Sequence, residues 1–402
     1  MHVAVIGAGI AGTLTAHYLT ARGLTVTVYE AAGQPASGAS AANGAQLSYS
    51  FSDPLNDPTL LSRLPGIFFG RDRAFRIGRT PRPEFLGWGL RFLRHCTAAG
   101  QERSSRALLE LSRRSAQLMP ALLEQHMAPE HRHRTGKLVL LPDPASPELE
   151  RRLAVKQELG FPVRLLDADE TIAQEPSLTT WATRPAAAIS CATDEAADAA
   201  RFCRTLSEHL MQQQTRFAFG EAISALTPDA RSGWRLTTTA TTHHADAVVL
   251  CNGLGAKALL QPLGVRLPLL AMEGHSLTLP ATAGSPRASL TAHAQRIVFS
   301  PFGKAVRIAG FADLNGPGRQ PERQRQLLAV ARALAPHAAD YETAEPQGWS
   351  GTRVMTPDSL PIVGQLPAPG LFSNLGHGML GWTLGAACAD AVAAAVAQEQ
   401  DR

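Results

Sequence analysis

The chain lacks several features that would assign it to a class at once. Its 402 residues contain only five cysteines, dispersed and without a C-x-x-C pair, which argues against a disulfide framework or a zinc ribbon. No apolar run reaches the roughly 18 residues that span a membrane. The opening MHVAVIGAGIAG has no basic leader. We therefore expect a cytoplasmic protein with reduced thiols, without a signal peptide or a transmembrane helix.

Charge is also sparse, at 18% of residues against 45% hydrophobic ones, so a disordered chain is not expected. The length predicts two domains. The net charge of +4 conceals one local excess, because the segment from Arg63 to Arg114 holds twelve arginines and four acidic residues among aromatic side chains. This segment predicts either peripheral contact with an anionic membrane or a solvated face. No nucleic-acid-reading motif accompanies it, and we expect no nucleic-acid partner.

The N-terminus carries a nucleotide-binding pattern. An apolar run at residues 3–7 leads into a glycine turn, a helical segment follows, and a second apolar run ends at Glu30. Gly7 permits the tight turn, Gly9 lets a pyrophosphate approach the backbone, and Gly12 lets the helix pack on the sheet. Glu30 can accept hydrogen bonds from ribose hydroxyls. The predicted cofactor contacts here are Gly7, Ala8, Gly9, Ile10, Ala11, Gly12 and Glu30.

Two later segments favour FAD over NAD. Residues 37–48, SGASAANGAQLS, form a small-residue loop after the second apolar run, and residues 371–385, LFSNLGHGMLGWTLG, predict a strand, a glycine turn and a helix start. A second helix N-terminus at the cofactor would stabilise negative charge on a reduced flavin. A further turn at Asn252-Gly253 would face the dinucleotide. The additional predicted cofactor residues are Ser40, Asn43, Gly44, Ala45, Gln46, Asn252, Gly253, Gly376, His377, Gly378, Met379, Leu380, Gly381 and Thr383.

The segment WSGTRVMTPDSLPIVG, residues 349–364, places Arg353 among residues typical of packed structure. If Arg353 is buried it needs an anion, because an unpaired buried charge is strongly unfavourable. The anion could be a ligand carboxylate or an internal acid such as Asp358. No metal site is expected, since His243-His244 has no third ligand at a recognisable spacing.

Taken together, these segments resemble the D-amino-acid oxidase superfamily of FAD proteins, and within it the branch of bacterial D-amino-acid dehydrogenases. The likeness runs through most of the chain. Besides GAGIAG, it includes SAANGAQLS (40–48), GKLVLL (136–141), TDEAAD (193–198), EGHSLTLP (273–280), WSGTRVMTPDSLPIVG (349–364) and GHGMLGWT (376–383).

The resemblance implies that Arg353 holds the substrate carboxylate beside the flavin through two parallel hydrogen bonds. It also implies a position near the substrate pocket for His275, where relatives commonly have tyrosine, and one at the flavin edge for His377. We predict Arg353, His275 and His377 as catalytic residues; a His275 without a role and a loop-shaping His377 are the alternatives. Val354 in place of proline and the order of residues 43–46 also depart from the branch, as does the missing C-terminal extension. These departures leave the substrate side chain open.

The expected fold class is α/β, with a Rossmann-like FAD-binding domain interleaved with a substrate domain built on an antiparallel sheet. We assign residues 1–84, 186–262 and 345–402 to the FAD-binding domain, and residues 85–185 and 263–344 to the substrate domain.

The predicted function is FAD-dependent oxidative deamination of D-amino acids to 2-oxo acids and ammonia, by hydride transfer to flavin N5. Electrons would then pass to a quinone or another carrier, with the basic segment as a possible contact with the inner face of the cytoplasmic membrane. The first alternative is oxidation of secondary or N-substituted amino acids such as sarcosine, glycine, hydroxyproline or glyphosate-like compounds. A third hypothesis is an accessory flavin-binding or NAD(P)-binding protein without amine chemistry.

Overall fold

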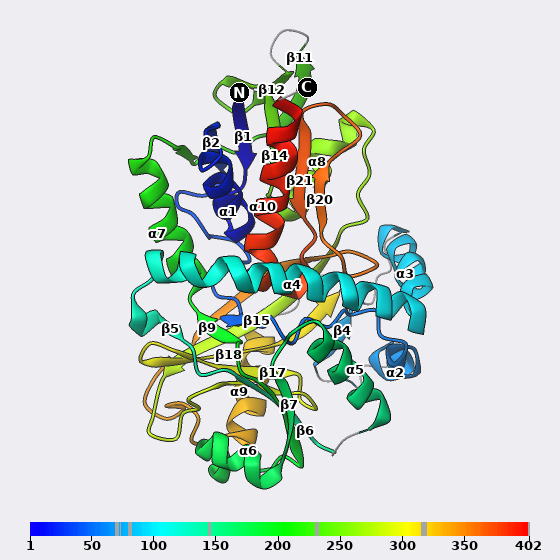
Figure 1. Cartoon of the computed structure of the whole chain (residues 1–402), viewed down its shortest axis with the longest axis vertical. Helices are drawn as coiled ribbons and strands as arrows, with labels where there is room; N and C mark the ends of the chain where they lie inside the picture. Colours follow the sequence, from blue (N-terminus) through cyan, green and yellow to red (C-terminus); the bar gives the residue numbers. More distant parts are fainter. Residues whose placement is uncertain are drawn as a thin grey trace.

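The computed structural model describes residues 1–68, 72, 74–78, 83–143, 146–229, 233–314 and 320–400. Its upper part in Figure 1 is built on a mostly parallel sheet, in which only the edge strand β20 is antiparallel to its neighbour. Val3 and Val5 face one hydrophobic cluster while Ala4 and Ile6 face another, as expected for a strand covered on both sides. In spatial order the strands are β10 (Arg216–Phe219), β2 (Thr25–Glu30), β1 (His2–Ile6), β14 (Ala247–Leu250), β21 (Leu371–Leu375) and β20 (Ile362–Gln365).

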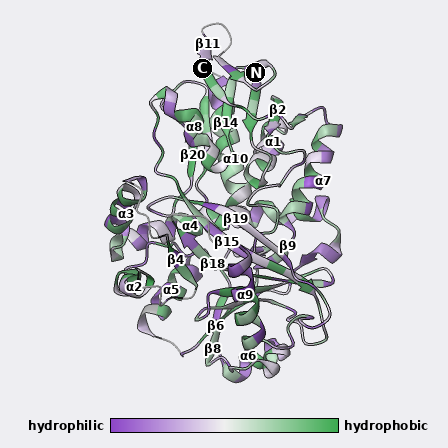
Figure 2. Cartoon of the chain, turned by 180° about the vertical axis from the view of Figure 1, so that it is seen from behind, coloured by the Kyte–Doolittle hydropathy of each residue, from purple (hydrophilic) through white to green (hydrophobic). Residues whose placement is uncertain are grey.

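Helices cover one face of this parallel sheet. They are α1 (Ile10–Thr20), α7 (Ala199–Gln212) and α10 (Gly381–Gln400), and α4 (Ala98–His126) packs against α10 and α7. The other face carries a small antiparallel sheet and a short helix, made of β11 (Ala225–Asp229), β12 (Gly233–Thr237), β13 (Thr242–Ala245) and α8 (Ala256–Leu260). Figure 2 shows the hydrophobic colouring concentrated in β14, β20 and α10.

The lower part of the molecule is built on a second, mostly antiparallel sheet. Helix α9 (Gln320–Leu334) packs against its strands β15, β18 and β19, and α6 (Ala168–Gln174) packs on β7 and β8. The strand order is β19 (Gln347–Met355), β15 (Leu270–Pro280), β18 (Ala305–Leu314), β17 (Ile297–Phe302), β16 (Ser289–Ala292), β6 (Lys137–Leu141), β8 (Ala187–Cys191) and β7 (Val163–Asp167), with β4 (Phe75–Ile77) paired to β18.

The two parts are joined across the middle of the molecule. Helix α4 runs along their junction in Figure 1. A small sheet formed by β3 (Gln46–Leu47), β9 (Glu195–Ala197) and β5 (Arg132–His133) ties the loop after β2 to the segments that lead into both parts. The remaining helices, α2 (Thr59–Phe68), α3 (Pro83–His95) and α5 (Pro147–Glu158), lie beside α4 and the antiparallel sheet.

Three strands belong to a different sheet from the one that the predicted domain borders imply. Strands β4, β8 and β19 pair within the antiparallel sheet, although the borders at residues 84, 186 and 345 assigned them to the FAD-binding domain. Strand β19, for example, pairs with β15 over its whole length, from Gln347 to Met355. The division into two interleaved domains stays a prediction.

One helix passes a length and composition test for crossing a membrane, contrary to the expectation from sequence. Residues Gly378–Gln400 contain an 18-residue window of mean hydropathy 1.5, of which 61% is buried inside the protein. Within it, Asp390 forms an ion pair with Arg22 at 2.6 Å. Because α10 packs between α1 and α4, we interpret it as a core helix.

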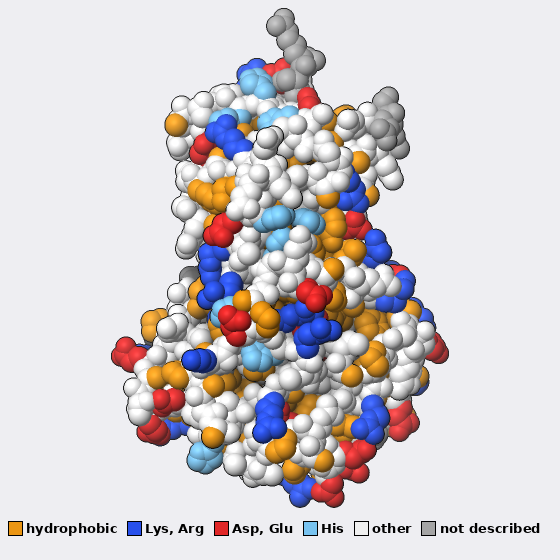
Figure 3. Space-filling model, turned by 60° about the vertical axis from the view of Figure 1, so that its left-hand side comes forward, with side chains coloured by type: hydrophobic (Ala, Val, Ile, Leu, Met, Phe, Trp, Pro, Cys, Tyr) orange, Lys and Arg blue, Asp and Glu red, His pale blue; other side chains and the backbone are white. Residues whose placement is uncertain are grey.

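The surface charges are mixed in sign. On the face shown in Figure 3, basic and acidic side chains alternate rather than forming a field of one sign. All five cysteines lie in the described residues and are unpaired there, as predicted for reduced thiols. Of the basic segment 63–114, residues 69–71, 73 and 79–82 lie outside the described residues.

Candidate active site

The turn between β1 and α1 has the geometry that a dinucleotide needs. Gly7 has φ +101°, a conformation that favours glycine. A Cβ on Gly12 would lie 1.8 Å from the carbonyl oxygen of Gly7, so only glycine permits this approach of helix and turn. Glu30, at the end of β2, accepts hydrogen bonds from the backbone N–H of Ala8 (2.7 Å) and of Ala32 (2.9 Å). Glu30 therefore braces the turn, and its predicted contact with the ribose stays a prediction.

The turn after β14 lies next to the glycine turn between β1 and α1. A Cβ on Gly7 would lie 2.9 Å from the Cα of Asn252, and Gly253 has φ +60°. The Oδ1 atom of Asn252 is buried and has no hydrogen-bond partner among the described residues. An unsatisfied buried acceptor beside the glycine turn is what a site for the hydroxyls or amine of a dinucleotide would contain. The residues present thus fit an FAD-type cofactor.

A cavity of about 680 Å³ lies between the two sheets, large enough for a flavin ring and a small substrate. The predicted residues that line it are Ile10, Ser40, Asn43, Gly44, Ala45, Gln46, His275, Arg353, Gly378, Met379, Leu380, Gly381 and Thr383. The other predicted residues do not line it. Those at the first turn and beside it are Gly7, Ala8, Gly9, Ala11, Gly12, Glu30, Asn252 and Gly253, and those in the loop before α10 are Gly376 and His377.

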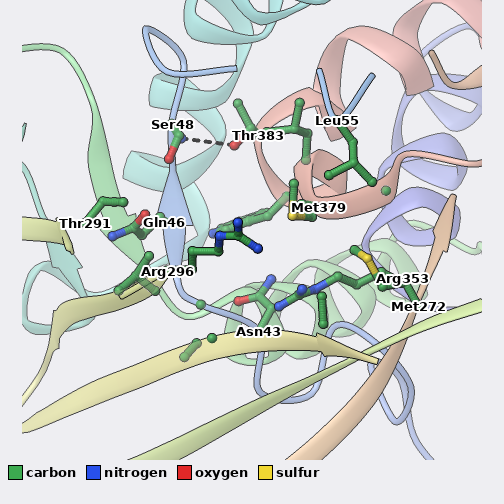
Figure 4. A pocket seen from close by; sticks show the side chains of 18 of the residues that line it. Asn43, Gln46, Ser48, Leu55, Met272, Thr291, Arg296, Arg353, Met379 and Thr383 are labelled. Atoms are coloured by element: carbon green, nitrogen blue, oxygen red, sulfur yellow. Dashed lines mark hydrogen bonds between the residues drawn. The ribbon is translucent and has the colours of Figure 1, made fainter. Parts of the chain in front are cut away.

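The loop of residues 39–48 is fixed on both sides of the cavity. The backbone N–H of Ile10 donates to the Ser40 hydroxyl (3.0 Å), and the backbone N–H of Ser48 donates to Thr383 Oγ1 (3.0 Å), as Figure 4 shows. Ala45 has φ +59° and donates its N–H to Asn43 Oδ1 at 2.9 Å. Because Gly381 and Thr383 stand in the first turn of α10, the positive end of this helix borders the cavity.

Arg353, on β19, reaches into the cavity beside Asn43 (Figure 4). Its Nη1 donates to the carbonyl of Phe311 at 3.2 Å. It forms no ion pair within the described residues, and the carboxylate of Asp358 instead accepts the backbone N–H of Leu360. Burial lowers the pKa of Arg353 to about 10, partly opposed by the charge of Asp313. The internal partner considered from sequence is therefore not found, and the guanidinium stays protonated at neutral pH.

Gly274, on the neighbouring strand β15, makes room for this arginine. A Cβ at residue 274 would lie 2.4 Å from Cζ and Nη2 of Arg353, well inside van der Waals contact. The glycine in EGHSLTLP is thus part of the site, a role that the sequence did not reveal.

His275 is held in a buried network. Its Nδ1 contacts Ser350 Oγ at 2.7 Å, its Nε2 contacts Asp313 Oδ2 at 3.2 Å, and the residue is 1% exposed. Asp313 also binds Arg323 of α9, the helix that covers the opposite face of the sheet. With both ring nitrogens engaged, the contacts indicate a structural role, and the catalytic role predicted for His275 remains untested.

His377 shapes the loop before α10. Its Nε2 contacts Asn374 Oδ1 at 2.8 Å, and Asn374 donates to Thr15 Oγ1 at 3.0 Å. Burial lowers the pKa of His377 to about 4, so the ring is neutral at neutral pH. These contacts agree with the loop-shaping alternative.

Three cations that line the cavity, Lys137, Arg152 and Arg296, were missed from sequence. Lys137, on β6, is 3% exposed and donates to Ser48 Oγ at 2.8 Å, and burial lowers its pKa. Its position in the apolar segment GKLVLL could have indicated from sequence that this lysine is buried. Arg296 lines the same cavity from the hairpin between β16 and β17, and no pattern in the sequence indicates this position. In the described ranges no group of three or more His, Cys, Asp or Glu side chains could hold a metal ion.

Comparisons with known proteins agree with this geometry. The family described as FAD dependent oxidoreductase (DAO) matches residues 2–395. "D-amino acid dehydrogenase 2" of Ralstonia nicotianae is 36% identical, over 99% of this chain and 97% of the relative. "D-amino acid dehydrogenase" of Paramagnetospirillum magneticum is 34% identical, over 96% and 92%. The expected family is thereby confirmed.

Solved structures show the same fold. Glycine oxidase from Geobacillus kaustophilus has a TM-score of 0.75 and 22% identity, over 98% of this chain and 94% of that one. L-proline dehydrogenase from P. horikoshii has a TM-score of 0.72 and 17% identity, over 99% and 93%. The expected α/β fold class is confirmed.

Proposed function

Because this chain belongs to the DAO family of FAD-dependent oxidoreductases, we propose that it oxidises D-amino acids to 2-oxo acids and ammonia. Two relatives named D-amino acid dehydrogenase, each more than 30% identical over nearly the whole chain, support this substrate class. The observation that carries the proposal is Arg353, a cavity-lining cation that forms no ion pair within the described residues.

In this proposal the side chains bind and orient rather than exchange protons. Arg353 fixes the substrate carboxylate with two parallel hydrogen bonds, and a fixed carboxylate sets the position of the neighbouring Cα–H. FAD, when bound, supplies the two-electron acceptor. The substrate loses two electrons and two protons to become an imine, which water hydrolyses to the 2-oxo acid and ammonia. The N-terminal turn of α10 and the buried Lys137 place positive charge around the cavity, which favours an electron-rich cofactor.

The test is anaerobic mixing of the purified yellow protein with D-amino acids, their L-enantiomers, sarcosine and glycine, while flavin absorbance at its visible band is followed. Bleaching by D-amino acids, with dye reduction in the steady state, is the expected result. Bleaching by sarcosine or glycine alone would replace the proposal by the first alternative, which includes both substrates. A flavin that no amine bleaches would refute both and support the hypothesis of an accessory subunit.

We further propose that electrons leave to a quinone or similar carrier at the cytoplasmic membrane surface. Helix α3 supports this: Leu86, Leu90 and Leu93 are 53%, 62% and 39% exposed at helical spacing, next to the basic Arg91 and Arg94. Its opposite face is buried through Trp88 and Phe92, whose rings stack. Exposed leucines flanked by arginines are suited to an anionic bilayer surface.

Flotation with vesicles containing anionic lipid tests this second part. The expected result is co-flotation at low salt that is lost in the Leu86→Ser/Leu90→Ser variant. Met211→Ser, which alters an exposed apolar residue on α7, is the control. Protein that stays in the soluble fraction at low salt would refute membrane contact and leave the amino-acid proposal intact.

A further inference from the structure

Arg296 has features that the proposed oxidation does not use. It ends the turn between β16 and β17 with φ +54°, a conformation that is uncommon for a residue with a side chain. Such strain persists where the surroundings require a particular side chain at that point. Its Nη1 lies 3.1 Å from Asp72 Oδ2. The other oxygen of Asp72 accepts the backbone N–H groups of Ala74 and Phe75, so the carboxylate is fixed by the chain before β4.

The second nitrogen of this guanidinium is unsatisfied. Nη2 of Arg296 is buried and has no hydrogen-bond partner in the described part of the chain. A buried donor without an acceptor is unfavourable, and more so when the donor is charged. Figure 4 shows Arg296 and Arg353 both extending into the pocket, Arg296 from the turn between β16 and β17 and Arg353 from β19. Within the described residues, the guanidinium of Arg353 likewise has a single hydrogen-bond partner, the carbonyl oxygen of Phe311.

The acids that line the cavity are already engaged. Asp53 contacts Lys156 at 3.0 Å and Asp57 contacts Arg152 at 2.9 Å. Asp72, which is not among the lining residues, contacts Arg296. A ligand that satisfies both Arg353 and Nη2 of Arg296 must therefore bring two acceptor groups of its own. Carboxylates suit a guanidinium best, since they accept charge-assisted hydrogen bonds and donate none.

We infer that Arg296 is a specificity-determining residue that binds an acidic group on the substrate side chain. The substrate class of the site is then amino acids with two carboxylates, one held by Arg353 and the other by Arg296, such as D-aspartate and D-glutamate. Asp72 orients Arg296 and leaves one of its edges for the ligand. The oxidation of dicarboxylic amino acids rests on the proposed function. The binding of dicarboxylates at Arg353 and Arg296 does not depend on it.

The decisive experiment measures binding without turnover. The FAD-loaded protein is titrated with succinate and glutarate, and with propionate and butyrate, while the flavin spectrum is followed. We expect succinate to bind about tenfold or more tightly than propionate, and glutarate than butyrate, since each monocarboxylate lacks only the second carboxylate of its counterpart. Arg296→Gln should reduce this preference to near unity and Arg296→Lys should keep part of it. Arg164→Gln, which removes an exposed arginine paired with Glu170, should leave it unchanged.

Turnover gives the second readout. The ratio of kcat/KM for D-glutamate over D-glutamine, and for D-aspartate over D-asparagine, should exceed one and fall about tenfold or more in Arg296→Gln. Equal binding of mono- and dicarboxylates by the unaltered protein, or a preference that Arg296→Gln does not change, would overturn the inference. If no D-amino acid is oxidised, the proposed reaction fails, and the dicarboxylate titration still decides the role of Arg296.

Discussion

Replacing Gly274 by alanine tests the site through a single methyl group. The residue faces the guanidinium of Arg353 across the β15–β19 pair, where Met272 and Gly274 are partnered by Arg353 and Gly351. Its backbone is not in the left-handed region, so alanine adopts the same conformation without strain. The substitution therefore acts on the side chain of Arg353 and not on the strand itself.

The size of the effect follows from the geometry. The new Cβ would lie 2.4 Å from Cζ and Nη2 of Arg353 and 2.8 Å from Nε, whereas ordinary contact begins near 3.4 Å. The guanidinium has to move by about 1 Å, enough to break at least one of two parallel hydrogen bonds to a carboxylate. Hydrogen bonds to charged groups contribute about 1.5–3 kcal/mol. We expect kcat/KM to fall about 10- to 100-fold, mostly through KM.

The assay is steady-state dye reduction with a D-amino acid series, alongside thermal unfolding. Gly33→Ala is the matched control, because a Cβ there meets nothing within 4 Å and should change neither property. An unaltered kcat/KM in folded, FAD-loaded Gly274→Ala would refute the assignment of Arg353 to the substrate carboxylate.

Three other substitutions test the remaining contacts. Arg353→Lys keeps the charge but loses the planar guanidinium that makes two parallel hydrogen bonds. We therefore expect kcat/KM to fall about 10- to 100-fold in the same dye assay. Asp313→Asn leaves the fully buried Arg323 without its carboxylate, so urea unfolding should show a loss of about 3–5 kcal/mol. His126 has its pKa lowered to about 4 by burial and by the neighbouring His209 and His17. Because the unfolded state then binds more protons, stability should fall as pH drops from 6.5 to 4, by on the order of 3 kcal/mol, and His126→Leu should flatten this dependence.

Local geometry was the part that the sequence predicted well. The glycine turn at Gly7, the acid that closes β2 and the return of the chain through α10 are each specified by residues close together in sequence. Residue 12 must be glycine because a Cβ there would clash with the carbonyl of Gly7, only five residues earlier in the chain. The loop of residues 37–48 was predicted to contact the flavin; it lines the cavity at Ser40 and residues 43–46, and its contact with the cofactor stays a prediction.

The direction in which strand residues face was harder to predict. His275 follows a register shift between Glu273 and His275, which turns its ring toward Ser350 and Asp313. Alternation along EGHSLTLP cannot reveal a bulge, because the bulge depends on the partner strand β18. Arg296 was missed for a related reason: its place in the cavity depends on pairing between β16 and β17 and on Asp72, which lies more than two hundred residues earlier.

The residues proposed to hold the cofactor and those proposed to bind the substrate come from different sheets. The glycine turn, Thr383 and the first turn of α10 come from elements of the parallel sheet, whereas Arg353 and Arg296 come from the antiparallel sheet. Loop 39–48 is bound to both, through Ile10 and through Ser300, whose hydroxyl donates to the carbonyl of Gly44 at 2.7 Å. Substitutions in the hairpin that carries Arg296 should therefore change the choice of substrate without loosening the cofactor. A change in cofactor affinity of Arg296→Gln as large as its change in dicarboxylate affinity would show that the two tasks are not separable.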